Sequence, residues 1–277
     1  MLQIKRLDHV SMAAANWRSQ ADRLQSLFGF KFLSSWDGLG ADDFSGCVSQ
    51  IPGADLEFEV ITPNGPENFV QKFLNTAGPG PHHITIEVED INAAASELER
   101  LGVDPFGGVQ DDGEWYVTYV HPRDSRGVLY QLFVSHREER EVDRRTTGGG
   151  ICDVKRARLV SIDSPDLDEQ IKFQERVFGM DLEARSTDST TGESLAVMRM
   201  PQSELRFEFV HGRLGLPEGS RPGIHHLALE VGSVERALEA LRGSGVEPAQ
   251  AGTGPAIPAW DVLPADAGGV RFRLFEE

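Results

Sequence analysis

The chain has 277 residues, of which 39% are hydrophobic and 26% charged; this composition is typical of a globular protein and excludes a disordered or fibrous one. Its net charge of −17 repels phosphate backbones and anionic lipids, so we expect neither nucleic acid nor membrane partners. Two cysteines, Cys47 and Cys152, cannot form a disulfide framework, and neither a membrane-length apolar run nor a secretory signal is visible, so we expect a cytoplasmic protein.

The first predicted unit begins with a short apolar strand at LDHV (7–10). Apolar side chains then recur every three or four residues and predict a helix over Asn16–Leu27. The helix should end near Gly29, because glycine readily adopts the left-handed conformation that stops helices. Three strand-like runs follow, at 30–35, 44–51 and 55–62. The order of elements is therefore β-α-β-β-β.

A second unit repeats this order from PHHI (81–84) onward. The same spacing of apolar side chains predicts a helix over Ile91–Leu101, which should end near Gly102. The strand-like runs after it are 103–107, 115–121 and 127–134.

Both units then return in the second half of the chain. PHHITIEVEDINAAASELERLGV (81–103) is similar to IHHLALEVGSVERALEALRGSGV (224–246), and GVLYQLF (127–133) to GVRFRLF (269–275). This repeat predicts two domains, 1–135 and 155–277, each with two β-α-β-β-β units. The intervening residues 136–154 are charged and then glycine-rich, which predicts a linker.

The order of the units and the paired HHI and GVLYQLF motifs resemble the vicinal oxygen chelate superfamily, which contains glyoxalases, bleomycin-resistance proteins and extradiol dioxygenases. The resemblance covers nearly the whole chain. The first domain is most similar to the methylmalonyl-CoA epimerase family, through HHITIEVEDI and YVHPRDSRGVLYQLF. The resemblance implies an α+β fold with tandem domains, in which four β-α-β-β-β units form two open eight-stranded cups.

The resemblance also implies a metal on the floor of the first cup, held by one residue from the first strand and one from the fourth strand of each unit. These positions are His9, Glu59, His83 and Gln131. Strand alternation agrees, since the apolar residues at 56, 58 and 60 share one face and leave Glu59 on the other. Imidazole and oxygen ligands suit a divalent ion such as cobalt, nickel, manganese, zinc or iron(II). Taken singly, each histidine would be an ordinary hydrogen-bonded core residue.

The predicted ligand set departs from that of the epimerase family, which has His, Gln, His and Glu in chain order. Here the glutamate and the glutamine have exchanged places, and glyoxalase I shares a glutamate at the position of Glu59. Besides Glu59, an epimerase needs a second base, and the family's residue for that role falls on Cys47. A thiol serves as an acid or base only if its surroundings lower its pKa. A buried structural cysteine is the alternative reading of Cys47.

The second domain is expected to have lost its metal. Its corresponding positions are Leu159, Glu208, His226 and Arg273. An apolar residue replaces one ligand, and a cation that would repel a metal replaces another. We expect Arg273 to pair with Glu208 instead, and the second domain to cover the first cup or to complete a structural pairing.

Three functions remain open from the sequence. The first is a metal-dependent epimerase, isomerase or lyase that acts on a small oxygenated carbonyl or acid substrate, with a metal-stabilised enolate and with Glu59 or a nearby base moving the proton. The second is an iron(II)-dependent extradiol-type dioxygenase, which the two-domain length favours and the absence of a carboxylate on the last strand of the first domain disfavours. The third is a binding protein that sequesters a ligand. A small molecule is the expected partner, and a homodimer stays open.

Overall fold

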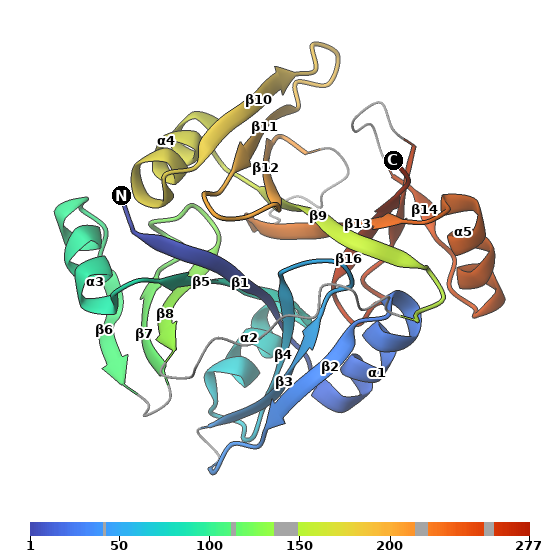
Figure 1. The fold of residues 1–277 in the computed structure, drawn as a ribbon, viewed down its shortest axis with the longest axis horizontal. Helices are drawn as coiled ribbons and strands as arrows, with labels where there is room; N and C mark the ends of the chain where they lie inside the picture. The colour runs from blue at the N-terminus through green and yellow to red at the C-terminus, as the bar shows by residue number, and fades with distance from the viewer. Residues whose placement is uncertain (41–42, 112–114, 136–148, 214–220, 252–257) are drawn as a thin grey trace. The chain divides into compact units, whose positions relative to one another are not determined.

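The protein is described here by a computed structural model that covers residues 1–40, 43–111, 115–135, 149–213, 221–251 and 258–277. Its strands form two open eight-stranded sheets, with the orders β2-β3-β4-β1-β5-β8-β7-β6 and β10-β11-β12-β9-β13-β16-β15-β14 (Figure 1). Five helices accompany them among these residues. The predicted α+β class with two tandem, open eight-stranded cups is confirmed. The predicted linker lies mostly outside the described residues.

The elements of the first half are β1 (Ile4–Ala13), α1 (Trp17–Phe28), β2 (Lys31–Trp36), β3 (Phe44–Gln50), β4 (Glu57–Pro63), α2 (Phe69–Ala77), β5 (Gly80–Val88), α3 (Ile91–Arg100), β6 (Pro105–Asp111), β7 (Trp115–Val120) and β8 (Leu129–Ser135). Those of the second half are β9 (Val154–Asp163), α4 (Leu167–Phe178), β10 (Asp181–Thr187), β11 (Ser194–Arg199), β12 (Arg206–His211), β13 (Gly223–Val231), α5 (Val234–Gly243), β14 (Ala249–Gln250), β15 (Ala259–Val262) and β16 (Arg271–Phe275). Apart from α2, both halves follow the predicted order.

Each of the four units pairs its first strand in parallel with its last strand. The pairs are β1 with β4, β5 with β8, β9 with β12 and β13 with β16. The remaining pairs within each unit are antiparallel hairpins, such as β3 with β4. Because the register is the same in all four parallel pairs, residues at equivalent sequence positions also occupy equivalent places in the sheets.

The first helix of each half begins and ends on the residues that its sequence suggests. The Asn16 side chain accepts a hydrogen bond from the Ser19 amide at the start of α1, and Gly29 ends the helix with φ 73°. Asp166 and Gly179 have the same roles for α4. A side-chain cap and a left-handed glycine satisfy backbone groups that the helix itself leaves unpaired. The predicted end of the first helix at Gly29 is confirmed.

The helix α2 was not predicted. It packs through Val70 against Ala13 of β1 and Ile61 of β4, with Phe73 and Leu74 beside them. Ala13 and Ile61 lie on the same face of their strands as His9 and Glu59, because side chains alternate along a strand. α2 therefore covers part of the face that carries the predicted metal ligands.

The first compact unit comprises Met1–Asp8, His83–Glu141 and Leu159–His225. Its core joins β8 to α4: the ring centroids of Tyr130 and Phe178 lie 4.7 Å apart, and Gln174 Nε2 donates to the Tyr130 hydroxyl over 3.1 Å. The strands β1–β8 form one sheet and the strands β9–β16 form the other. The first compact unit, in contrast, contains residues from both predicted domains.

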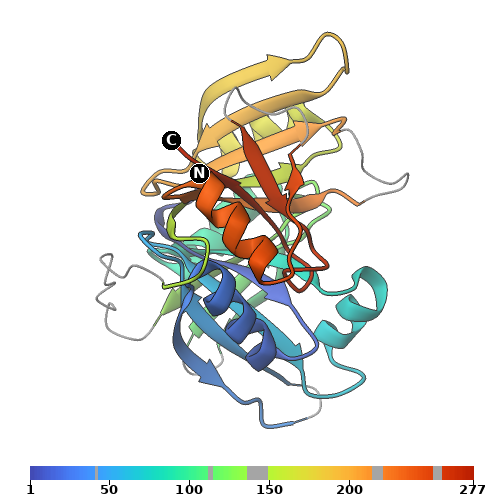
Figure 2. The ribbon, with the colours of Figure 1, turned by 90° about the vertical axis from the view of Figure 1, so that its right-hand side faces the viewer.

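The second compact unit comprises His9–His82, Val142–Arg158 and His226–Glu277. Here Phe272 of β16 packs against Phe28 of α1, with ring centroids 4.5 Å apart, and against Phe58 of β4 at 5.9 Å. Figure 2 shows α1 lying along the strands of its own unit. Since such aromatic clusters bury large apolar areas, we expect β16 and α1 to stabilise each other.

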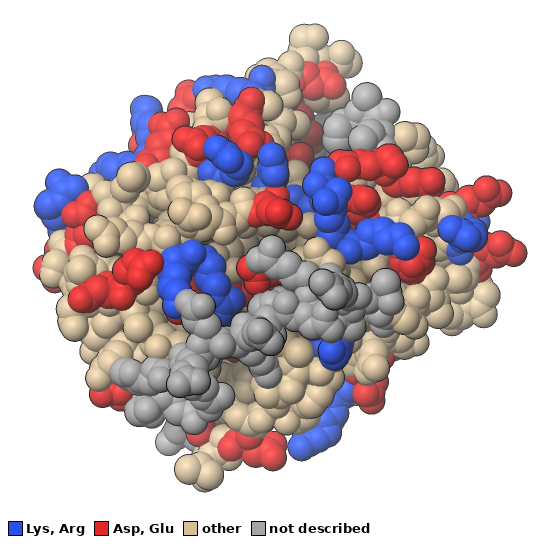
Figure 3. Space-filling model, in the orientation of Figure 1, with Lys and Arg blue, Asp and Glu red and all other residues tan. Residues whose placement is uncertain are grey.

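Charged side chains of both signs are interspersed over the described part of the face shown in Figure 3. The excess of acidic residues is therefore not gathered into a single patch on that face. Among the described residues, no helix is long and apolar enough to cross a membrane.

Candidate metal centre

The parallel pair β1–β4 positions the first two predicted ligands. Ser11 stands opposite Glu59 in the register, and His9 lies two residues before Ser11 on the same face. The His9 side chain is only 8% exposed, and its Nε2 lies 3.6 Å from Glu59 Oε2. The Ser11 hydroxyl donates a hydrogen bond of 2.6 Å to the same carboxylate oxygen. This bond fixes the orientation of Glu59 toward the imidazole.

The third predicted ligand is the buried His83 of β5. Its ligand atom and those of His9 and Glu59 all lie within 4.8 Å of one another. Among the residues that the structure describes, no other group of three histidine, cysteine, aspartate or glutamate side chains has this spacing. Two imidazoles and one carboxylate are a donor set that suits a divalent transition metal. The residues present therefore fit the metal that the sequence predicts.

Gln131, the fourth predicted ligand, is oriented by a threonine. It stands opposite Thr85 in the β5–β8 pair, and Thr85 Oγ1 donates to its Oε1 over 2.9 Å. Its Nε2 faces the Tyr119 hydroxyl at 3.5 Å. Thr85 therefore holds Gln131 as Ser11 holds Glu59. The role of Gln131 as a ligand stays a prediction.

Cys47 does not share a face with Glu59. In the β3–β4 pair Cys47 stands opposite Val60, whereas Val48 stands opposite Glu59. Because side chains alternate along a strand, the Cys47 thiol is directed to the other side of the sheet. Burial, together with the negative charge of Glu59, raises the pKa of this thiol to about 12, which keeps it neutral. Both observations argue against the acid–base role predicted for Cys47 and favour its reading as a buried structural residue.

The neighbouring His82 lies against α2. Its ring centroid is 4.7 Å from that of Phe73 and 5.9 Å from that of Phe69. Burial lowers the pKa of His82 to about 4, although the charge of Glu59 acts in the opposite direction. Its contacts are those of an aromatic packing residue, which agrees with its omission from the predicted ligands.

The equivalent place in the second sheet carries an arginine. Ser161 stands opposite Glu208 and donates to its Oε1 over 2.5 Å, just as Ser11 does to Glu59. Leu159 stands where His9 stands in the first sheet. The Arg213 guanidinium bonds the Ser161 hydroxyl at 2.6 Å and lies 3.8 Å from Glu208, and it pairs with Asp163 at 2.5 Å. The counter-charge of Glu208 is therefore Arg213.

Arg273, which we expected to pair with Glu208, pairs with Asp261 of β15. Its Nε lies 2.8 Å from an Asp261 oxygen, and Arg271 reaches the other oxygen at 3.0 Å. Burial raises the pKa of Asp261, but the hydrogen bonds and charges of the two arginines outweigh it and hold that pKa below its usual range. The expected Arg273–Glu208 pair is replaced by these two separate clusters.

Three hydroxyl residues that the sequence analysis did not single out orient the side chains at the fourth-strand positions. Ser11, Thr85 and Ser161 each follow the first-strand ligand position by two residues, and each donates to the side chain on the paired strand. The signal was present in the sequence, since LDHVSM, PHHITI and ARLVSI carry a serine or threonine at the same offset. Arg213 had no such signal, because it has no counterpart among the predicted ligands.

Comparisons with known proteins agree with this arrangement. The model of the glyoxalase/bleomycin resistance protein/dioxygenase superfamily matches residues 8–119 and 160–263. Over 134 residues, 47% of this chain and 97% of the relative, the chain is 31% identical to the ethylmalonyl-CoA/methylmalonyl-CoA epimerase of Cereibacter sphaeroides. Over 131 residues, 46% of this chain and 72% of the relative, it is 28% identical to the mitochondrial methylmalonyl-CoA epimerase of Homo sapiens.

The fold is also similar to solved structures over the full length of the chain. A mutant of 4-hydroxymandelate synthase from Streptomyces coelicolor matches with a TM-score of 0.70 and 14% identity, covering 100% of this chain and 93% of that one. A fusion of a xylose isomerase-like TIM barrel with a 4-hydroxyphenylpyruvate dioxygenase matches with a TM-score of 0.64 and 16% identity, covering 99% of this chain and 49% of that one. At these identities the likeness concerns the fold alone. Because the family model matches both halves of the repeat, the chain belongs to the glyoxalase/bleomycin resistance protein/dioxygenase superfamily.

Proposed function

We propose that the protein is a metal-dependent acid–base enzyme, an epimerase, isomerase or lyase, that acts on a small carbonyl or acid substrate. The observation that carries this proposal is the convergence of His9, Glu59 and His83, whose ligand atoms lie within 4.8 Å of one another. When bound, a divalent ion would supply Lewis-acid stabilisation of the negative charge that develops on a substrate oxygen during proton transfer. Such chemistry needs no oxidation of the ion.

The chain's own residues divide the remaining tasks. His9 and His83 are nitrogen donors for the ion, and their burial keeps water from competing for them. Ser11 holds one oxygen of Glu59, so that this carboxylate has a fixed direction from which to hold the ion or to accept a proton. Glu57 stands opposite His9 in the register and so shares this face, which makes it a candidate for a second acid–base group.

The epimerase relatives suggest the first substrates to test. Their names refer to ethylmalonyl-CoA and methylmalonyl-CoA, which are thioesters of 2-substituted malonic acids. The residue opposite Glu59 on the neighbouring strand is the apolar Val48. A reaction that needs one base, such as an isomerisation or an elimination, therefore fits Glu59 better than a two-base epimerisation that includes Cys47.

A dioxygenase is the second candidate. Two histidines and one carboxylate are also the donor set of many iron(II) oxygenases. The full-length likeness to a 4-hydroxyphenylpyruvate dioxygenase fusion agrees with the tandem length of the chain, although it concerns the fold alone. The carboxylate of the present site is on β4, whereas the equivalent last strand of the first sheet carries Gln131.

Proton exchange without oxygen separates the two candidates. The full chain, loaded with cobalt or manganese, is incubated in deuterated water under anaerobic conditions with methylmalonyl-CoA and a panel of 2-oxo and 2-hydroxy acids. The proposal expects deuterium at the carbon next to the carbonyl, loss of exchange in Glu59→Gln, and retained metal binding in the matched variant Glu57→Gln. Turnover that requires iron and consumes oxygen would overturn it in favour of the dioxygenase.

A further inference from the structure

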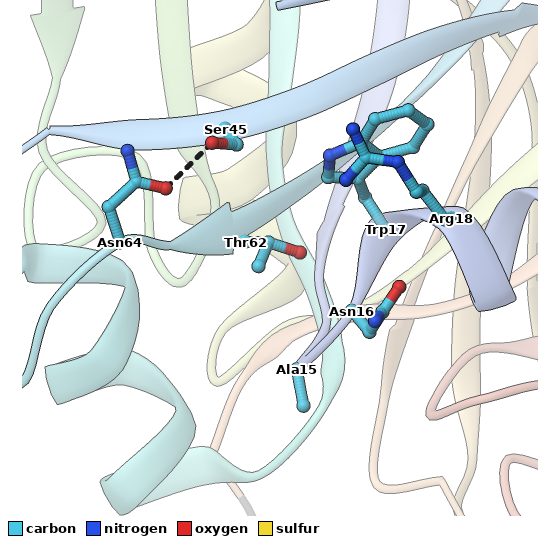
Figure 4. A pocket seen from close by; sticks show the side chains of 7 residues that line it. All are labelled: Ala15, Asn16, Trp17, Arg18, Ser45, Thr62 and Asn64. Atoms are coloured by element: carbon cyan, nitrogen blue, oxygen red, sulfur yellow. Dashed lines mark hydrogen bonds between the residues drawn. The ribbon is translucent and has the colours of Figure 1, made fainter. Parts of the chain in front are cut away.

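A polar pocket of about 170 Å³ lies at the N-terminus of α1 (Figure 4). The side chains that shape it include Trp17 and Arg18 from the helix, Ser45 from β3, and Thr62 and Asn64 from the end of β4 and the loop after it. All belong to the second compact unit. A pocket of this volume can hold about five groups of the size of a water molecule. It is therefore large enough for a carboxylate or phosphate group but too small for a nucleotide.

The pocket is separate from the predicted metal ligands. Ser45 stands opposite Thr62 in the β3–β4 pair, and Thr62 is three residues beyond Glu59. Because side chains alternate, Thr62 and Ser45 lie on the opposite face of the sheet from Glu59. This is the face on which Cys47 and α1 also lie.

The indole of Trp17 supplies the main evidence that something binds here. The residue is only 7% exposed, and among the described residues no acceptor lies within hydrogen-bond distance of its N–H group. Figure 4 shows the nitrogen edge of the ring turned toward Thr62 and Ser45. Since a buried donor without an acceptor costs stability, the geometry favours an external acceptor at this place.

The ring itself is well held. It stacks on Phe32 with ring centroids 6.3 Å apart, and the Arg18 guanidinium lies 4.3 Å from its centroid. The indole therefore keeps its direction whether or not the pocket is occupied. Trp17→Phe removes the donor and keeps an aromatic ring at this position, although the smaller ring fills less of the buried space.

Several polar groups around the pocket are already hydrogen-bonded to one another or to nearby backbone. Asn16 Oδ1 accepts from the Ser19 amide, and Asn64 Oδ1 accepts from the Ser45 hydroxyl over 2.6 Å. The hydroxyl of Thr62 donates to the carbonyl of Ala14. The indole N–H, the Arg18 guanidinium and the positive end of the helix dipole can act on a ligand in the pocket.

The positive charge of Arg18 is only weakly compensated by neighbouring carboxylates. Its one ion pair among the described residues is with Asp37, at 3.5 Å, and the two side chains are 64% and 74% exposed. Pairs in such exposed positions contribute little, because water and salt screen them. A ligand anion in the pocket would meet a guanidinium that is held in place by the Trp17 ring but only weakly neutralised.

We propose that this pocket binds an oxyanion, the carboxylate or phosphate group of a small molecule, through the Trp17 indole N–H and the Arg18 guanidinium. The proposal does not depend on the proposed function, because the pocket and the predicted metal ligands lie on opposite faces of the sheet. The pocket is thus a second ligand site in the same β-α-β-β-β unit.

The indole N–H signals of the full chain test this proposal by nuclear magnetic resonance. The chain has four tryptophans, so Trp17→Phe identifies the Trp17 signal by its disappearance. Inorganic phosphate and acetate are titrated separately, with chloride at matched ionic strength. We expect the Trp17 signal to move saturably with phosphate or acetate, and the stronger of the two identifies the group; the Trp36→Phe variant should bind as the wild type does.

Arg18→Gln is the second variant, since Arg18 is exposed and its loss should leave the fold intact. We expect it to weaken anion binding about tenfold, the loss of one charge-assisted contact. His83→Ala should leave anion binding unchanged, which separates this site from the metal centre. Equal shifts with chloride, no saturable shift, or unchanged binding in Arg18→Gln would each overturn the proposal.

Discussion

The first and the second sheet each place a glutamate away from water, and they surround its negative charge with different residues. In both, a serine of the first strand donates to a glutamate of the fourth strand, at 2.6 Å from Ser11 to Glu59 and at 2.5 Å from Ser161 to Glu208. In both, the register of the parallel pair is the same. The residue two positions before the serine differs, since it is His9 in the first sheet and Leu159 in the second.

This difference decides where the counter-charge of the carboxylate comes from. A carboxylate removed from water needs a cation or hydrogen-bond donors near it. In the second sheet the chain supplies Arg213 itself, whereas in the first sheet the neighbours of Glu59 are His9 and His83, the predicted metal ligands. The shared serine and glutamate are thus a common frame, which is surrounded by the predicted metal ligands in the first sheet and by an internal ion pair in the second.

The largest expected effect is loss of metal from the first sheet. His83→Ala removes one of the two predicted imidazole ligands, so we expect metal affinity to fall at least about 100-fold. The loss of a residue that only supports a ligand lowers metal affinity less than this. The matched control is His226→Asn, at the equivalent position of the second sheet. Elemental analysis of both variants after dialysis measures the effect; equal metal loss in both would break the comparison.

The next effect concerns the internal cation of the second sheet. Arg213→Met leaves Glu208 and Asp163 without their counter-charge, and breaking such a mostly buried cluster costs about 3 kcal/mol. Urea unfolding of the metal-free protein measures the loss. Arg213→Lys, which keeps the charge, should recover part of it. If Arg213→Met unfolds at the wild-type urea concentration, the cation has no stabilising role.

A smaller effect follows from the pKa of Asp261, which lies below its usual range. A carboxyl group with a lowered folded pKa stabilises the protein at neutral pH, and this contribution is lost as the pH falls below the usual aspartate range and through the folded pKa. Asp261→Asn should destabilise the protein by about 2 kcal/mol at neutral pH and flatten its acid unfolding curve. An acid profile that matches the wild type would contradict this assignment.

The smallest effect comes from the serine of the common frame. Ser11→Ala removes the hydrogen bond that orients Glu59, and we expect metal affinity to fall about tenfold, as for other residues that support a ligand. Ser161→Ala in the second sheet is the matched control and should leave metal affinity unchanged. Competition with a fluorescent chelator measures both, and identical affinities for the wild type and Ser11→Ala would show that the serine has no such role.

The sequence predicts the fold and most of the candidate site because both depend on repeated strand patterns. His9, Glu59 and His83 come together since each occupies a fixed position in a β-α-β-β-β unit, and the repeat shows those positions. The face on which Cys47 lies could not be predicted, because a count without gaps does not show the register of β3, whereas the structure does.

Other features depend on contacts between distant segments. Arg213 reaches Asp163 and Ser161 from beyond the end of β12, and no local pattern specifies that pairing. The packing of Phe272 against Phe28 likewise joins a strand and a helix from opposite ends of the chain. The helix α2 was missed although its apolar residues recur at helical spacing, because it is not part of the β-α-β-β-β order on which the prediction rests.

Anomalous diffraction from crystals of the metal-loaded full chain tests the central claim most directly, because it locates the ion. We predict one site per chain, with His9, Glu59 and His83 as ligands, and no ion beside Glu208, where Arg213 already lies. A peak at Glu208, or an ion held without His9 and His83, would contradict the account.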